Sequence, residues 1–290
     1  MKYRFIDREK QWFGLDVLCR TVDVSRGGYW SWVRRRPSVR TMDDAMLLAD
    51  VRRIYGAGRG NYGSPRIHDA LRKKGTRCGK KRIERLMRQN GIKAKHKRKY
   101  KPLSTDSAHH LPVAENLLNR QFQRSQPNEA WVTDTTYIWT GEGWLYLAAM
   151  LDLFSRRIVG WAMGPQNDTG LVLRALHMAA QRRRPPKGLL HHSDRGSTYA
   201  SGDYQAALRQ YGMTCSMSRK GNCWDNAPME SWFHTLKVEL VHDRKFATRR
   251  EAESAIFEYM EVFYNRQRIC MTIGGFAPAQ YEEQQPRKVA

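Results

Sequence analysis

The chain has 290 residues, 41% of them hydrophobic and 27% charged, so it contains enough apolar material for a core and is not disordered throughout. It has no apolar run of about 18 residues, which argues against a membrane-spanning helix, and no apolar stretch in its first ten residues, which argues against a secretory signal. Its five cysteines include no CxxC pair, which argues against a disulfide framework and a zinc ribbon. The cysteines thus indicate a reducing, cytoplasmic compartment. Its 51 lysines and arginines exceed its 28 aspartates and glutamates, and the net charge of +23 favours a polyanionic partner.

The positive charge is concentrated in the first 128 residues, whose net charge is +20, against +3 for the remainder. Nucleic acid is the commonest partner of such a field, and solubility alone or an anionic membrane surface are the alternatives. We expect residues 1–40 to form an N-terminal helical segment, with two short helices in residues 12–36. A small helix-turn-helix and an amphipathic pair that packs on the rest of the protein both fit this segment.

Residues 41–101 have the pattern of a helix-turn-helix-like DNA-binding domain. A helix over 42–56 precedes two short helices, which begin near Ser64 and Lys80 and are separated by a turn at Gly75. The second short helix has a basic outer face and a basic tail follows it, so we expect both to contact DNA, although a solvated basic face is the alternative. The expected contacts are Lys81, Arg82, Arg85, Arg88, Lys97, Arg98 and Lys99. Residues 102–128 contain three prolines and predict a linker.

From residue 129 the pattern changes to strands, and residues 129–245 predict a catalytic core. The predicted elements are strands at 131–138, 144–152, 157–163, 188–192 and 213–217, and helices at 169–183 and 203–211. The first three strands predict an antiparallel meander, and the later alternation predicts helices on the faces of the sheet. The fold class is therefore α/β, a mixed sheet with flanking helices, preceded by a small all-α region. Residues 246–290 predict a C-terminal helical segment that Thr248 opens with a capping box.

Three acidic residues are candidates for one metal site. Asp134 interrupts a hydrophobic strand, Asp194 follows the end of a strand, and Glu230 lies on the first turn of a helix that begins at Pro228. Carboxylates suit Mg²⁺ or Mn²⁺, and two such ions can activate an attacking oxygen and stabilise a leaving one in phosphodiester chemistry. A helix cap or a salt bridge is the alternative role for each acid taken alone.

Two segments around these acids resemble a known family. They are residues 192–199, HSDRGSTY, and residues 216–239, SMSRKGNCWDNAPMESWFHTLKVE. They resemble the DDE transposases of bacterial insertion sequences, specifically the second-frame (OrfB-type) protein of the insertion-sequence-three (IS-three) family, and also the retroviral integrase core. Asp194 and Glu230 have 35 residues between them, which is the spacing of the family, and Lys237 lies seven positions after Glu230. Asp134 fits the first acid of the family.

The resemblance implies an RNase H-like, integrase-like core in which Asp134, Asp194 and Glu230 are catalytic and hold two Mg²⁺ or Mn²⁺ ions, without zinc. The implied activity is metal-dependent cleavage and strand transfer of insertion-sequence DNA. Water and then a DNA 3′-hydroxyl would attack phosphodiesters, so no covalent protein–DNA intermediate is needed. Additional DNA contacts are expected in the core, and these are Arg195, Asn226 and Lys237.

The expected partners are the terminal repeats of the element and its target DNA, an upstream helix-turn-helix protein or fusion, and further copies of the chain on paired DNA ends. We expect no membrane contact and a place in the bacterial cytoplasm near the nucleoid. A catalytically silent DNA-binding regulator or assembly subunit is one alternative, and a structure-specific nuclease is another. The sequence departs from the family pattern at Cys270-Met271, where a histidine and a small polar residue usually stand.

Overall fold

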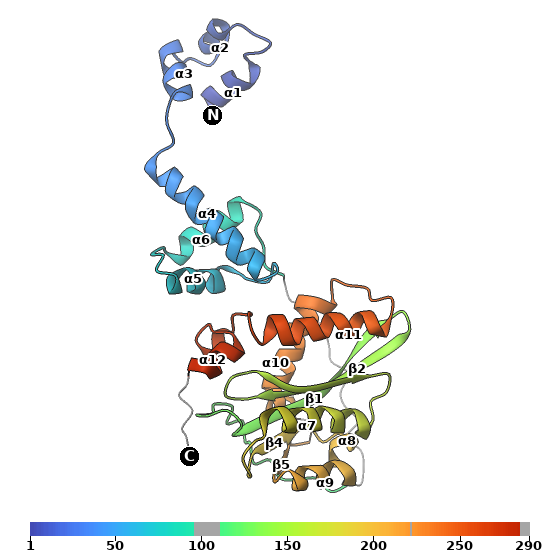
Figure 1. Ribbon diagram of the computed structural model, residues 1–290. Coiled ribbons are helices and arrows are strands. Elements are labelled where there is room, and N and C mark those ends of the chain that lie inside the picture. The colour runs from blue at the N-terminus through green and yellow to red at the C-terminus, as the bar shows by residue number, and fades with distance from the viewer. Residues whose placement is uncertain (96–110, 221, 285–290) are drawn as a thin grey trace.

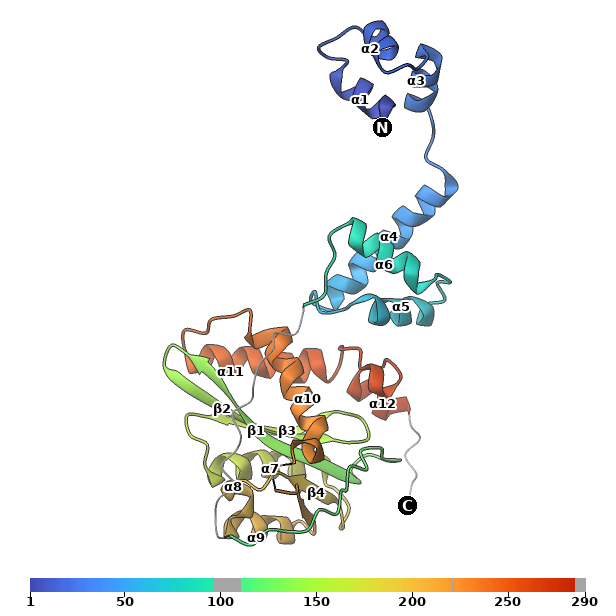
Figure 2. The same ribbon diagram turned by 180° about the vertical axis from the view of Figure 1, so that it is seen from behind.

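The computed structural model describes residues 1–95, 111–220 and 222–284, and these form three parts in chain order (Figures 1 and 2). Three short helices make an N-terminal unit, three further helices make a second unit, and the remainder builds a five-stranded sheet with helices on both faces. No helix in the described ranges is long and apolar enough to cross a membrane.

The N-terminal unit packs three helices around a few buried side chains. Its helices are α1 (Lys2–Glu9), α2 (Leu15–Thr21) and α3 (Arg26–Val33). Ile6, Leu18 and Tyr29 meet in its core, and the Ser25 hydroxyl caps α3 by accepting a hydrogen bond from the Gly28 amide. The sequence predicts α2 and α3 but not α1, because Ile6 is the only buried residue of α1 and leaves little apolar periodicity to detect.

The second unit has the three helices that the sequence predicts. They are α4 (Val39–Ala57), α5 (Ser64–Lys73) and α6 (Lys80–Gln89). Their apolar faces meet in one cluster, whose buried members include Leu47, Val51, Ile67, Leu71, Ile83 and Leu86. Helix α6 ends at Gln89, and Gly91, which has a positive φ of 67°, stops it two residues later as expected. Helix α4 begins at Val39, so the expected border between residues 40 and 41 lies inside this helix.

The sheet is mixed, as the sequence predicts. Its strands are β1 (Ala130–Thr140), β2 (Gly143–Asp152), β3 (Ile158–Gly164), β4 (Leu190–Ser193) and β5 (Thr214–Met217), in the order β3-β2-β1-β4-β5. Strands β1, β2 and β3 form the antiparallel meander, whereas β1, β4 and β5 are parallel. The alternation along each strand divides the apolar side chains between two hydrophobic clusters, one on each face.

Helices cover both faces of the sheet (Figures 1 and 2). On the first face lie α7 (Thr169–Arg183), α8 (Ser197–Ala200) and α9 (Gly202–Gln210). On the second face lie α10 (Ala227–Leu236), which follows a 3-10 turn, η1 (Cys223–Asn226), and α11 (Arg249–Phe257). The remaining elements are η2 (Lys237–Val241), η3 (Glu258–Tyr264), η4 (Met271–Ile273) and α12 (Pro278–Gln284). Gly160 of β3 lets α7 approach closely, because a Cβ there would overlap the Ala175 carbonyl and Ala179.

Segments that the sequence assigns to a linker and to a C-terminal part belong to the same hydrophobic core. Leu118 is fully buried against the second face of the sheet, together with Val132. Ile256 and Phe263 lie in the same cluster, so that cluster continues across the expected border at residue 245. The core that positions the site is therefore built by the meander, α10 and the C-terminal helices together.

Candidate active site

Three elements bring Asp134, Asp194 and Glu230 to one end of the β1–β4 pair. Val132 of β1 is in register with His192 of β4, so Asp134 and Asp194, each two residues further along parallel chains, lie at the same level. Helix α10 packs against β1 and carries Glu230 in its first turn, as the proline at position 228 predicts. Three acids that are 36 to 96 positions apart in the sequence therefore come to the same end of the sheet.

The charges of Asp194 and Glu230 act on Asp134. Burial raises the pKa of Asp134 well above its usual range, and the neighbouring charges of Asp194 and Glu230 raise it further. The Thr135 amide, 2.7 Å from Asp134 Oδ1, and the Lys237 ammonium oppose this rise in the pKa. Partial burial of its carboxyl also raises the pKa of Glu230. A carboxyl such as Asp134, whose pKa is raised by burial and by neighbouring like charges, is a candidate functional group.

The acids do not form a closed ligand set in the part of the chain that the structure describes. Across residues 1–95, 111–220 and 222–284, no group of three or more His, Cys, Asp or Glu side chains lies close enough together to hold a metal ion. Asp194 Oδ1 accepts a hydrogen bond from the Gly196 amide at 2.9 Å, and Glu230 is exposed on its helix. The three carboxylates share an electrostatic environment and supply the hard oxygen donors that Mg²⁺ and Mn²⁺ prefer.

Asp225 anchors the chain just before α10, and the sequence does not single it out. Its carboxylate is fully buried and accepts hydrogen bonds from Arg120 Nε at 2.9 Å and Asn116 Nδ2 at 2.8 Å. Arg219 adds its backbone amide, Nε and Nη2, at 2.7–2.9 Å. These hydrogen bonds hold the pKa of Asp225 far below its usual range, chiefly through Arg219. This carboxylate therefore fixes the start of the helix that carries Glu230.

Asn226 lies inside the protein rather than on its surface. Only 4% of the residue is exposed, and its Nδ2 donates to the Thr133 carbonyl at 3.1 Å. The expected contact of Asn226 with DNA stays a prediction, and in the folded chain the side chain of Asn226 is buried and links the start of α10 to β1. Thr133 immediately precedes Asp134, so Asn226 ties the first residues of α10 to the strand beside the first acid.

Buried polar side chains support the strand that leads to Asp194. His192 contacts the Ser216 hydroxyl through Nδ1 at 2.9 Å and the Ser218 hydroxyl through Nε2 at 3.1 Å. Burial lowers the pKa of His192 to about 4 and that of His191 to about 3, so both are neutral at pH 7. Arg195, which is expected to contact DNA, donates from Nε to the Ser218 carbonyl at 2.6 Å and so links the segments that follow β4 and β5.

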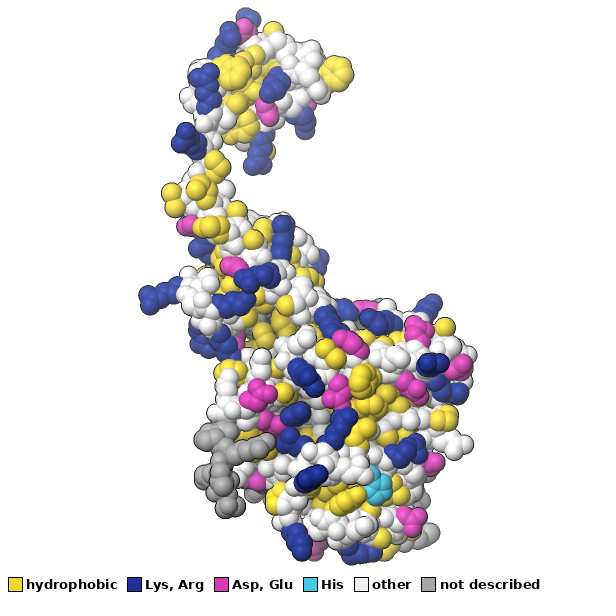
Figure 3. All heavy atoms as spheres, viewed as in Figure 1, with side chains coloured by type: hydrophobic (Ala, Val, Ile, Leu, Met, Phe, Trp, Pro, Cys, Tyr) yellow, Lys and Arg dark blue, Asp and Glu magenta, His cyan; other side chains and the backbone are white. Residues whose placement is uncertain are grey.

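The basic face of α6 is divided between paired and exposed side chains. Arg82 Nε and Arg85 Nη2 both donate to Asp44 of α4, at 2.7 and 2.6 Å. Lys81 and Arg88 are exposed on the same helix. Figure 3 shows Lys and Arg side chains spread over both helical units, and acidic side chains more frequent over the sheet domain. Lys97, Arg98 and Lys99, also expected to contact DNA, lie outside the described residues.

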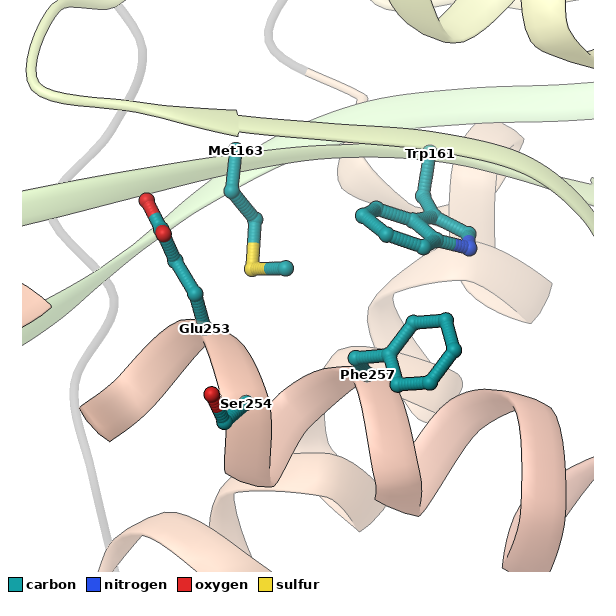
Figure 4. Close-up of a pocket in the computed structure, with 5 residues that line it drawn as sticks. All are labelled: Trp161, Met163, Glu253, Ser254 and Phe257. Carbon is teal, nitrogen blue, oxygen red and sulfur yellow. The ribbon is translucent and has the colours of Figure 1, made fainter. Parts of the chain in front are cut away.

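A cavity of about 400 Å³ lies at the β3 edge of the sheet, away from the acids (Figure 4). Trp161 and Met163 of β3 face Glu253, Ser254 and Phe257 of α11 across it. Strand β2 separates β3 from β1, so this cavity is not part of the carboxylate site.

Comparison with known proteins identifies the parts of the chain. Residues 124–223 and 230–285 match family models described as an integrase core domain, and residues 42–100 match an HTH-like domain. The chain is 41% identical over 288 residues to the transposase InsF for insertion sequence IS3A of Escherichia coli (strain K12), covering 97% of this chain and 98% of that protein. It is 45% identical over 266 residues to the insertion element IS600 uncharacterized 31 kDa protein of Shigella sonnei, covering 92% and 97%.

Solved structures with a similar chain path are viral integrases. The simian T-cell lymphotropic virus intasome, in complex with PP2A regulatory subunit B56 gamma, aligns at 18% identity with a TM-score of 0.48, covering 77% of this chain and 76% of that one. The HTLV-2 integrase catalytic core domain in complex with magnesium aligns at 16% identity with a TM-score of 0.42, covering 54% and 97%. Because the InsF transposase matches at 41% identity over 97% of this chain, the protein belongs to the IS3 family of insertion-sequence transposases.

Proposed function

We propose that this chain cleaves DNA at the ends of an insertion sequence and joins those ends to target DNA. The observation that carries the proposal is that Asp194 and Glu230 lie near enough to Asp134 for their charges to raise its pKa. The chain that holds these acids matches a transposase over 97% of its length. The reaction class is phosphodiester hydrolysis followed by transesterification, as the resemblance implies. Asp134, Asp194 and Glu230 are the proposed catalytic residues.

The donor chemistry of the three acids fits a hard divalent cation. All three are carboxylates, and the like charges around Asp134 are those that Mg²⁺ or Mn²⁺ would neutralise. We therefore propose that Asp134, Asp194 and Glu230 would bind two such ions. When bound, the ions supply activation of an attacking oxygen and stabilisation of a leaving one.

The other residues of the site bind and position rather than react. Lys237 lies beside Asp134 and carries the positive charge that a DNA phosphate near the acids requires. Asn226 holds α10 to β1, and Asp225 holds the segment before α10, so both fix where Glu230 stands. Attack by water or a DNA hydroxyl needs no nucleophilic side chain, and we assign that role to none.

We assign DNA recognition to the basic half of the chain. Residues 41–101 are the proposed unit for the terminal repeats, with Lys81 and Arg88 of α6 presented to phosphates. The proposed parts around it are a helical segment of residues 1–40, a linker of residues 102–128, the core of residues 129–245 and a C-terminal segment of residues 246–290. Leu118 of the linker and Ile256 of the C-terminal segment pack in the core of the sheet domain. Further copies of the chain on paired DNA ends, and an upstream helix-turn-helix partner, are the proposed assembly.

A strand-transfer assay tests this function. Purified protein is incubated with labelled terminal-repeat DNA, taken from the sequence that flanks the gene, in Mg²⁺ or in EDTA. The variants are Asp134→Asn, Asp194→Asn and Glu230→Gln, with Asp203→Asn, an exposed acid of α9, as the matched control. We expect nicked and joined products from the wild type and the control in Mg²⁺ alone, and neither product from the three variants, which still bind the DNA.

Three other results would overturn the proposal. Cleavage without joining would assign the chain to the nucleases. Products that persist in Asp194→Asn would remove the acids from the chemistry. DNA binding without any product, also when the upstream partner is fused to the chain, would leave a silent DNA-binding regulator.

A further inference from the structure

We propose that the tip of the β1–β2 hairpin is a platform on which unpaired bases of the DNA strand stack, next to the acid site. The inference rests on the proposed function and adds a binding surface and its ligand, namely bases released from pairing near the scissile phosphate. The surface consists of Tyr137 and Trp139 of β1 and Trp144 of β2, and we call it the hairpin platform.

The side chains of the hairpin platform are open to solvent although they are large and apolar. Trp139 is 61% exposed and Trp144 is 42% exposed. The two are directly opposite each other in the strand register, with ring centroids 4.8 Å apart and ring planes at 76°. Tyr137 and Trp144 lie 4.9 Å apart at 81°. Together they form a contiguous aromatic surface of the kind that marks a binding site on a soluble protein.

Packing of the hairpin does not require these rings. The opposite face of the same strands carries Ile138 and Leu145, which are 1% and 0% exposed in the core of the sheet domain. The tip is held by the Gly141 amide, which donates to the Phe246 carbonyl at 2.9 Å, and by pairing of Thr140 with Phe246. The platform therefore lies on the face of the hairpin that the fold leaves uncovered.

The hairpin platform is continuous with the acid site through Lys237. The Lys237 ammonium lies 5.0 Å from the centroid of the Tyr137 ring, and it is also among the charges that act on Asp134. Asp134 and Trp139 lie on the same strand, five residues apart, so their side chains leave opposite faces of the strand, which rises about 17 Å between them. A stacked DNA strand advances about 3.4 Å per nucleotide, so about five nucleotides that pass beside Lys237 from one face to the other cover this rise.

The surrounding charge favours a nucleic acid over an apolar protein segment. Lys237 adjoins Tyr137, and Arg249 Nε donates to the Trp144 carbonyl at 3.0 Å. Glu142 in the hairpin turn accepts a hydrogen bond from the Arg249 amide at 2.8 Å, so two cations and one acid border the platform. Cations beside exposed aromatic rings match the phosphates and π-faces of a single strand, which binds by stacking without reading the sequence. A second copy of this chain is the competing occupant, and the experiment below separates the two.

Fluorescence of 2-aminopurine measures the stacking directly. The probe is a terminal-repeat duplex whose last about five nucleotides on one strand are unpaired, with 2-aminopurine at one of those positions. All proteins carry Asp194→Asn, so that binding is measured without chemistry and does not depend on the outcome of the strand-transfer assay. The test variants are Trp139→Ala, Trp144→Ala and Trp139→Phe, and the matched control is Phe257→Ala, an exposed ring of α11 beside the distant cavity (Figure 4).

We expect binding of the parent protein to quench the probe, and both Trp→Ala changes to restore its fluorescence. Affinity for the unpaired end should fall about tenfold, the loss of one base–ring stack, while affinity for a fully paired end stays within twofold. Trp139→Phe should retain most of the quenching, and Phe257→Ala should behave like the parent.

Several results would overturn the hairpin platform. Equal quenching in the parent and in Trp139→Ala and Trp144→Ala would show that the bases stack elsewhere. An equal loss of affinity for paired and unpaired ends would show a general contact instead of base stacking. A change of oligomeric state in Trp139→Ala, measured by sedimentation, would assign the surface to a second copy. Quenching that depends on both rings in a protein without joining activity would uphold the platform and reject the proposed chemistry alone.

Discussion

Asp225 shows how much a single buried carboxylate contributes to this site. Its side chain is fully buried, and Arg120 and Arg219 both donate to it. Asp225→Asn should lower the free energy of unfolding by about 3 kcal/mol, because a neutral amide leaves two guanidinium groups without their anion. Urea unfolding measures this change. Asp203→Asn, on the exposed first turn of α9, should stay within about 0.5 kcal/mol of the wild type, and equal losses in both variants would contradict the role of Asp225.

Buried histidines make the stability of the sheet domain depend on pH. His191 and His192 have pKa values of about 3 and 4 in the folded chain because burial disfavours their charged forms, against 6.5 for an unburied histidine. As the pH falls below 6.5, the unfolded chain binds protons that the folded chain does not, so stability is fully present above pH 6.5 and is lost toward pH 4.

We expect each of these histidines to remove about 2 kcal/mol of stability between pH 6.5 and pH 5, at about 1.4 kcal/mol per pH unit. Denaturation with urea at several pH values measures this slope. His192→Gln keeps a polar side chain without titrating, so its pH dependence should be shallower than that of the wild type. Parallel curves for the two proteins would show that His192 is protonated while folded.

The sequence identifies the three candidate acids but not the residues that hold their elements in place. Asp134, Asp194 and Glu230 lie at a strand, a strand end and a helix start, and the resemblance of their flanking segments to a transposase family predicts that they share a site. Asp225 could not be recognised in the same way, because only Arg219 among its partners is near, and Asn116 and Arg120 lie 109 and 105 residues away in the sequence. For Asn226 the sequence indicated a surface contact, and only the packing of α10 on β1 shows that it is buried.

At the level of elements, periodicity predicts the type of each helix and strand but not what its side chains meet. The meander, α7 and the alternating strands follow from local patterns, since each buries one or both faces. Helix α1 has one buried residue and was missed. Arg82 and Arg85 pair with Asp44, which joins α6 to α4 across 38 and 41 residues. The sequence therefore predicts one basic face on α6, whereas the structure divides its cations into side chains paired with Asp44 and exposed side chains.

This division of α6 has a measurable consequence for DNA binding. If the exposed cations of α6 contact phosphates, Lys81→Ala and Arg88→Ala should each reduce the slope of log affinity against log salt concentration by about 0.9. Arg82→Ala and Arg85→Ala should reduce it less, because Asp44 already neutralises part of their charge. Fluorescence anisotropy on terminal-repeat DNA at several salt concentrations measures the slopes. Four equal reductions would show that Asp44 releases both arginines to DNA.

On the scale of the whole molecule, the helical unit of α4–α6 is attached to the C-terminal part of the sheet domain. Arg59 Nη1 donates to Glu258 at 2.7 Å, and the Ile269 amide donates to the phenol oxygen of Tyr62 at 2.9 Å. These contacts join residues about 200 positions apart in the sequence, so no local pattern could predict them. The structure thus links the proposed DNA-recognition unit to η3, which packs in the same core as α10.

Lys73 offers the clearest test of this attachment. Its ammonium donates to the Gly274 carbonyl at 2.7 Å, lies 3.6 Å from the centroid of the Phe276 ring and pairs with Asp69 at 3.4 Å. Lys73→Met keeps the length of the side chain but removes the donor and the charge, and should cost about 1–2 kcal/mol. Lys74→Met changes the exposed neighbour on the same helix end and is the matched control.

Hydrogen exchange followed by mass spectrometry locates the effect of Lys73→Met. Amides of residues 269–276 should exchange about five- to 30-fold faster in this variant, because a loss of about 1–2 kcal/mol in the attachment raises the population of the open form by that factor. Amides of β1 and β2 should keep their protection, since their core lies on the sheet and not on this contact. Unchanged exchange in residues 269–276, or equal acceleration in Lys74→Met, would show that Lys73 does not hold the two parts together. Acceleration limited to Lys73→Met would establish that the helical unit is coupled to the domain that carries the acids. DNA bound by α6 would then be linked through this contact to the domain that contains α10.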